Sequence, residues 1–239
     1  MKPETGLFNG FSKELFKFLH DLEKNNSVDW FHKNKERYQK FLVEPSKAFI
    51  IELAPFFNHL NPAIRTEPKF NETLMRMNKD MRFAKGEPYR NYFLIHLGRF
   101  KLDSEFFLYF EAQEAQMGLF INQSKGENLY FRQNLFKYKN EIQNTFEKNN
   151  LNNKFSFHYF KKMETIKAVA KFDVKEHFEL FEKHEMILLQ KVKMPSSKSL
   201  GSSAIVVDMI KMVLSLYPLY CFAISPQPLK ELQRFEENF

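Results

Sequence analysis

The stretch from Phe70 to Phe100 constrains the fold more than any other part of the chain. Its centre, Leu74 to Arg82, alternates between residue types in the manner of a β-strand, whose successive side chains point to opposite faces. One face would carry mainly apolar side chains, namely Met75, Met77, Met81 and Phe83, interrupted by Lys79. The other face would carry Arg76, Asn78, Asp80 and Arg82. The pattern therefore predicts a central strand with one charged face.

The charged face of this predicted strand allows two interpretations. Burying it against a closed apolar core would cost much free energy, so it must meet water, a partner or a ligand. Asp80 would lie between Arg76 and Arg82, whose guanidinium forks suit carboxylate or phosphate oxygens. Lys85, Tyr89 and Arg90 follow and support a site for an anionic group. The alternative is a solvated sheet face whose charges neutralise one another, which is common in proteins.

The excess of positive charge lies mostly in the same segment. The chain has 36 Lys and Arg against 29 Asp and Glu, a net charge of +7. From Arg65 to Lys101, nine basic residues stand against four acidic ones, an excess of five. A basic balance allows a nucleic acid, a phosphate-bearing small molecule or an acidic partner without selecting among them. The 29 Phe residues recur at core spacings, so we interpret them as core residues and not as platforms for stacked bases.

The remaining composition indicates a soluble protein of a reducing compartment. Cys221 is the single cysteine, which excludes an intramolecular disulfide framework, and its apolar surroundings favour a small buried hydrophobe. The N-terminal sequence lacks the long apolar region of a signal peptide. We find no uncharged apolar stretch approaching the roughly 18 residues of a membrane span. We therefore expect a cytoplasmic protein that does not associate with membranes.

The periodicity of the sequence predicts one α+β domain over residues 1–239. Residues 8–61 would form a helical cover, with helices over 11–22, from Ser27 and from Pro45, and with a kink or a restart at Pro55. Residues 70–122 would form the central strands, which after Arg82 are 89–100, 105–111 and 117–122. Their connections are too short for parallel crossovers, so we expect antiparallel pairing.

Residues 127–239 would supply further helices and the remaining strands. We expect helices over 128–148, from Asp173 to Lys183, from Ser202 or Ser203 to a point before Pro218, and from Ser225 onwards. Strand-like runs cover 154–160, 164–172 and 185–193. The predicted fold class is thus α+β, an antiparallel sheet covered by an N-terminal helical segment and C-terminal helices.

Two stretches resemble the uncharacterised domain-of-unknown-function family 2461. The first, NNSVDWFHKNKERY at residues 25–38, resembles the opening block of that family, with paired Asn, then Trp-Phe, Asn-Lys and Tyr. The second, MRMNKDMRFAKGEPYR at residues 75–90, resembles its Arg-x-x-Arg/Lys-Asp-x-Arg-Phe run with a Pro-Tyr-Lys ending. Arg132 falls where the family has an Arg entering a helix. The resemblance implies an α+β fold and no known reaction.

No local motif for a metal site or a nucleophile is present in the sequence. The seven His residues show none of the close spacings of metal ligands, and there is no second Cys. The sequence also lacks a G-x-S-x-G elbow and a P-loop. We therefore expect no metal ion and no cofactor. Asp80 could serve as a general base, but two cationic neighbours should lower its pKa and make it a poor proton carrier near neutral pH.

Three functional hypotheses follow, and the sequence does not decide whether the protein is an enzyme. The first is binding of an anionic, phosphate-bearing ligand, either a small molecule or a nucleic acid. The candidate ligand-binding residues are Arg76, Asp80, Arg82, Lys85, Tyr89, Arg90 and Arg132. The second is a phosphoester hydrolase with Asp80 in the site. The third is a structural or protein-interaction module whose charge row is paired internally, for example with Asp29 or Glu36. The oligomeric state stays open.

Overall fold

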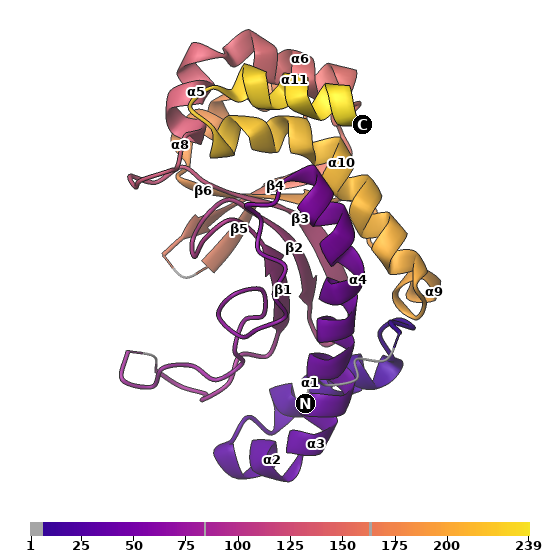
Figure 1. Ribbon diagram of the computed structural model, residues 1–239. Coiled ribbons are helices and arrows are strands. Elements are labelled where there is room, and N and C mark those ends of the chain that lie inside the picture. Colours follow the sequence, from indigo (N-terminus) through magenta and orange to yellow (C-terminus); the bar gives the residue numbers. More distant parts are fainter. Residues whose placement is uncertain (1–6, 84, 163) are drawn as a thin grey trace. The chain divides into compact units, whose positions relative to one another are not determined.

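The computed structural model describes residues 7–83, 85–162 and 164–239. The expectation drawn from the N-terminal sequence concerns in part residues 1–6, which lie outside the described residues. The strands are β1 Phe93–Leu97, β2 Glu105–Phe110, β3 Ala115–Asn122, β4 Phe155–Lys161, β5 Glu164–Val169 and β6 Met186–Lys191. They form one six-stranded sheet in the order β1-β2-β3-β6-β4-β5 (Figure 1). With the helices before and after it, this sheet confirms the predicted α+β class.

Along the chain, helices come before the first strand, between the strands and after the last strand. The N-terminal ones are α1 Lys13–Lys24, α2 Val28–Lys33, α3 Lys35–Tyr38, the π-helical η1 Gln39–Val43 and α4 Glu44–Leu60. The later ones are α5 Phe131–Lys137, α6 Lys139–Lys148, α7 Val174–His177, α8 Glu179–Lys183, α9 Ser197–Leu200, α10 Ala204–Ile224 and α11 Pro228–Asn238. Two of the predicted helix starts carry side-chain caps, since the Ser27 side chain accepts from the Trp30 amide and the Asp173 side chain accepts from the Lys175 amide.

Pro55, at which the sequence predicts a kink or a restart, and Pro218, before which it predicts a helix end, both lie inside helices. Helix α4 continues through Pro55, and α10 continues through Pro218 to Ile224. A proline removes one intrahelical hydrogen bond, which burial of an apolar helix can offset. Helix α10 is long and apolar enough to cross a membrane by length and composition alone, yet 67% of its apolar window is buried inside the protein. That burial is the pattern of a core helix in a soluble domain.

Internal contacts divide the chain into two compact units. Unit 1 comprises residues 1–97, 107–116 and 194–210, and unit 2 comprises residues 98–106, 117–193 and 211–239. In unit 1 the N-terminal helical segment covers its strands, since the Phe11 ring lies 4.7 Å from that of Phe110 and the Tyr38 ring lies 6.3 Å from that of Phe93. The assignment of the whole chain to one domain stays a prediction.

The core of unit 2 is a cluster of phenylalanines between strands and helices. The ring of Phe181 lies within 5.1–6.1 Å of five others, those of Phe131, Phe146, Phe157, Phe172 and Phe178. Strand β6 pairs antiparallel with both β3 and β4, so the last strand of the chain lies inside the sheet. Cys221 is fully buried. These side chains confirm that many of the Phe residues and the single Cys belong to the apolar core, whereas Phe83, Phe136 and Phe239 are exposed.

Candidate functional site

The predicted strand over Leu74–Arg82 does not form. The segment makes isolated bridges, from Leu74 to Phe70 and Ile95 and from Asn78 to Tyr89, and within the described residues it joins no regular ladder. The Lys79 amide donates to the Pro88 carbonyl at 2.8 Å, and the Arg90 amide donates to the Met77 carbonyl at 2.8 Å. Residues 76–79 and 88–90 therefore form a short irregular hairpin that carries a long turn.

A side chain takes the place of a neighbouring strand along this hairpin. The Arg90 guanidinium donates from Nη1 to the carbonyl oxygens of Arg76, at 3.0 Å, and of Asn78, at 2.9 Å. Such carbonyls need partners, which in a sheet would come from the next strand. Alternation of residue types along a segment does not show whether its backbone pairs with a strand or with a side chain. The sequence pattern therefore predicted a regular strand. Arg90 thus holds the backbone that presents Arg76 and Asn78.

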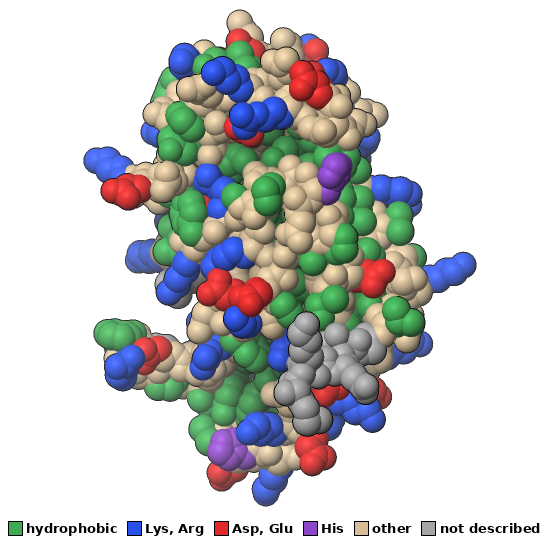
Figure 2. Space-filling model, viewed as in Figure 1, with side chains coloured by type: hydrophobic (Ala, Val, Ile, Leu, Met, Phe, Trp, Pro, Cys, Tyr) green, Lys and Arg blue, Asp and Glu red, His purple; other side chains and the backbone are tan. Residues whose placement is uncertain are grey.

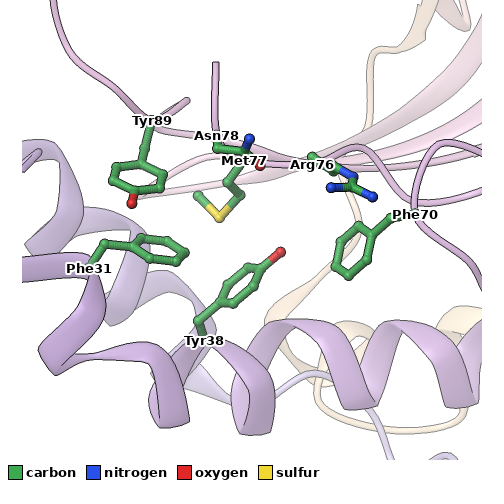
Figure 3. A pocket seen from close by; sticks show the side chains of 7 residues that line it. All are labelled: Phe31, Tyr38, Phe70, Arg76, Met77, Asn78 and Tyr89. Carbon is green, nitrogen blue, oxygen red and sulfur yellow. The ribbon is translucent and has the colours of Figure 1, made fainter. Parts of the chain in front are cut away.

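The hairpin and the N-terminal helices line a pocket of about 210 Å³ within unit 1, which is open to solvent where Arg76 and Asn78 are exposed (Figure 3). Its lining residues are Phe31, Tyr38, Phe70, Arg76, Met77, Asn78 and Tyr89. A regular strand would have pointed Met77 away from Arg76 and Asn78. The backbone instead bends at Met77, and all three side chains face the same pocket. The predicted separation into an apolar and a charged face is therefore wrong at this point.

The first of the two sequence blocks supplies the opposite wall of the pocket. Phe31 of α2 stacks on Tyr89, with ring centroids 4.0 Å apart and planes 9° apart. Asn26 fixes the Tyr89 backbone, because its Nδ2 donates to the Tyr89 carbonyl at 2.9 Å and its Oδ1 accepts from the Tyr89 amide at 3.1 Å. Tyr38 of α3 completes this wall. Residues 25–38 and 75–90 therefore meet at one site.

Arg76 is the cation of this pocket. Its guanidinium lies 6.0 Å from the centre of the Phe70 ring. Among the residues that the structure describes, no carboxylate forms an ion pair with it. Other cations of the basic segment are neutralised by the pairs Arg65–Glu72, Lys69–Glu67 and Arg82–Asp80, with N–O distances of 2.7–2.8 Å. Arg76 thus presents an uncompensated positive charge beside aromatic rings.

Two tyrosine hydroxyls accompany this charge. Burial raises the pKa of Tyr38, while the nearby Arg76 guanidinium acts in the opposite direction. Burial also raises the pKa of Tyr89. Both phenols therefore keep their protons at neutral pH. In the described part of the chain neither hydroxyl has a hydrogen-bond partner, so each is available as a donor to a ligand.

The structure places the other candidate residues differently. Asp80 accepts from Arg82 Nε and Nη2 at 2.9 and 2.7 Å, and these bonds lower the pKa of the Asp80 carboxyl. This pair and Lys85 are exposed on the turn and do not line the pocket. Arg132 belongs to unit 2, where its Nη1 donates to the Glu182 carbonyl and its guanidinium lies 5.6 Å from the Phe136 ring centre.

Five of the lining residues were not among the sequence candidates: Phe31, Tyr38, Phe70, Met77 and Asn78. Aromatic residues in a Phe-rich chain give no signal of their own, since most of them are core. The one usable signal was the 25–38 block, because its resemblance to a family block marked it together with 75–90. For metal ions, no group of three or more His, Cys, Asp or Glu side chains gathers within the described ranges.

Fold and site together define an α+β protein with an arginine-bearing aromatic pocket beside its sheet. The chain matches the model of a family described as a conserved hypothetical protein (DUF2461) over residues 14–222, and it belongs to this family. The match confirms the resemblance found in the two sequence blocks. No curated protein and no solved structure matches the chain significantly.

Proposed function

We propose that this protein binds a small anionic, phosphate-bearing ligand with the anionic group on Arg76. The unpaired Arg76 charge at the pocket carries the proposal. A guanidinium offers several N–H donors in a fork that suits phosphate or carboxylate oxygens. The protonated hydroxyls of Tyr38 and Tyr89 and the Asn78 amide add donors around the same space. The pocket thus has the ring-lined walls and few polar groups typical of ligand sites.

A small ligand fits the distribution of charge better than a nucleic acid does. Lys and Arg side chains on the face shown in Figure 2 are scattered and mixed with Asp and Glu. Nucleic-acid binding draws its affinity from many basic groups that follow the phosphate backbone. Arg82, which the sequence hypothesis included, is neutralised by Asp80. We also propose a cytoplasmic location, in keeping with the single, buried Cys221.

Two other functions have weaker support. A phosphoester hydrolase using Asp80 would need a carboxylate at the pocket that can carry a proton, whereas Asp80 is held by Arg82 on the exposed turn. A structural role for the charge row is favoured by the ion pairs Arg65–Glu72, Lys69–Glu67 and Arg82–Asp80, but it gives Arg76 no role. Neither of these two functions gives Arg76 a role, so substitution of Arg76 distinguishes them from anion binding.

The test is a titration with inorganic phosphate, followed by the Nε–Hε NMR signals of the arginines. The wild-type protein should show a saturable shift of the Arg76 signal. Arg76→Met should weaken phosphate binding about tenfold or more, because a charge-assisted hydrogen bond is lost. The matched control Arg82→Met, on the exposed turn, should bind as the wild type does. Equal affinities of wild type and Arg76→Met would overturn the proposal.

The same proteins separate the other two functions. Turnover of a panel of phosphoesters that disappears in Asp80→Asn, with thermal stability unchanged, would establish the hydrolase. A wild type that does not bind phosphate, combined with a large loss of stability in Arg76→Met, would establish the structural role. Binding without turnover is the result that we expect.

A further inference from the structure

The size of the pocket limits what it can enclose. Its volume is about 210 Å³. An apolar cavity of about 150 Å³ holds a benzene molecule, and pockets for drug-sized ligands begin near 300 Å³. The space in unit 1 therefore suits one six-membered ring with a compact substituent. A nucleotide, which has a base and a sugar besides its phosphate, would have to leave most of its atoms outside.

The walls of the pocket are suited to a flat ring. Of its seven lining side chains, five carry a ring or a thioether: Phe31, Tyr38, Phe70, Met77 and Tyr89. The rings of Phe31 and Tyr38 lie 5.1 Å apart at 52°, so they present surfaces at an angle to each other. Offset stacking and edge-to-face contacts with such surfaces stabilise a bound aromatic ring. The flexible Met77 side chain can fill the remaining gap.

The cationic group lies toward one end of the pocket. Figure 3 shows Arg76 with Phe70 on one side, Phe31 with Tyr89 on the other, and Tyr38 and Met77 between them. The Tyr38 hydroxyl points toward the segment that carries Arg76. An anionic group bound to Arg76 could accept a second hydrogen bond from this hydroxyl. The rest of the ligand would then lie against Phe31 and Met77.

We infer that the ligand is a single-ring aromatic anion, with one ring against Phe31, Tyr38 and Met77 and a phosphate or carboxylate on Arg76. The inference rests on the proposed function and narrows it to one class of ligand. Charge alone would not distinguish such a ligand from inorganic phosphate. The ring-lined space next to the Arg76 guanidinium distinguishes the two, because an aromatic anion can place its ring there and inorganic phosphate cannot.

The inference is tested by comparing inorganic phosphate, phenyl phosphate and adenosine monophosphate in calorimetric titrations of the wild-type protein. Phenyl phosphate should bind about tenfold or more tightly than inorganic phosphate, because its ring is removed from water. Adenosine monophosphate should bind no more tightly than inorganic phosphate, because its base and sugar exceed the pocket. Phe31→Leu should reduce the preference for phenyl phosphate, whereas Phe83→Leu, at a ring that is 86% exposed outside the pocket, should retain it.

The outcomes that would contradict the single-ring ligand differ from those that would contradict anion binding itself. Phenyl phosphate and inorganic phosphate of equal affinity would overturn the single-ring ligand and leave anion binding in place. Adenosine monophosphate binding as tightly as phenyl phosphate would also overturn it. Absence of binding by all three probes would overturn the proposed function itself. A thermal unfolding curve and the Arg76 response to inorganic phosphate establish whether Phe31→Leu is folded, so a loss of preference in that variant can be assigned to the ring.

Discussion

The Arg90 side chain shapes the candidate site through the backbone. Its guanidinium donates to the carbonyls of Arg76 and Asn78, two of the residues that line the pocket. Arg90 itself does not line the pocket. It is therefore a positioning residue, and its effect on a ligand should pass through the conformation of the hairpin.

For Arg90→Met we expect weaker phosphate binding together with a looser hairpin. Two carbonyls lose a charged donor, which should lower the free energy of unfolding by about 1–2 kcal/mol at this partly exposed position. Hydrogen exchange of the Lys79 amide, which donates to Pro88, should become faster. Arg90→Lys should restore part of both properties. Weaker binding with an unchanged exchange rate would mean that Arg90 contacts the ligand directly.

A second residue, His158 in unit 2, should make the stability of the protein depend on pH. Burial and the nearby Lys167 lower the pKa of His158 to about 4 from an ordinary value of 6.5. Its Nε2 lies 2.8 Å from Ser156 Oγ. Between these two pKa values the unfolded chain binds the proton and the folded protein does not, so stability falls as the pH drops through this window.

The expected loss from His158 is up to about 3 kcal/mol between pH 7 and pH 4. Urea unfolding at several pH values measures it. His158→Gln, which cannot take up a proton, should flatten the decline. His32→Gln, at an exposed position of unit 1, should leave the decline as in the wild type. The same decline in wild type and His158→Gln would show that other groups are responsible.

At the scale of elements, the pairing of β3 with β6 depends on one glycine. Gly118 lies opposite Gln190, and a Cβ added to it would come within 1.9 Å of the Leu189 carbonyl oxygen. That atom belongs to the backbone of the partner strand and cannot move without opening the ladder. The close approach of the two strands therefore requires a residue without a side chain.

Gly118→Ala should lower the free energy of unfolding by about 2–3 kcal/mol, because the added methyl group forces the strands apart. Gly126→Ala is the matched control, since its added Cβ would meet only the flexible Leu129 side chain at 3.1 Å on an exposed loop. This control should change stability by about 0.5 kcal/mol or less. Equal effects of the two substitutions in urea unfolding would contradict the described strand pairing.

Most helices and strands could be predicted because their periodicity is local. The helical cover over residues 8–61 and the strands β1 to β6 follow from apolar spacing in the sequence. The prediction of a strand over Leu74–Arg82 was wrong because an alternating pattern of residue types describes the side chains and not the hydrogen bonds of the backbone. Whether a strand forms also depends on a backbone partner, and here the Arg90 side chain is that partner. The continuation of α4 and α10 through prolines likewise depends on packing beyond the local sequence.

At the scale of the whole molecule, neither the strand order nor the pocket could be predicted. Strand β6 enters between β3 and β4, a placement that its own residues do not encode. Arg76 and Tyr89 were selected from their sequence block, but Tyr38 and Phe31 were not, because their role arises only where residues 25–38 meet residues 75–90. Sequence patterns therefore indicated the segment of the site but not the walls that enclose it.

The most direct test of the whole account is a crystal structure of the protein grown with phenyl phosphate. We expect phosphate oxygens at about 2.7–3.2 Å from the Arg76 guanidinium nitrogens, with the phenyl ring against Phe31 and Tyr38. Phosphate bound instead at Arg82 or Lys85 on the exposed turn, with the pocket free of the ligand, would contradict it.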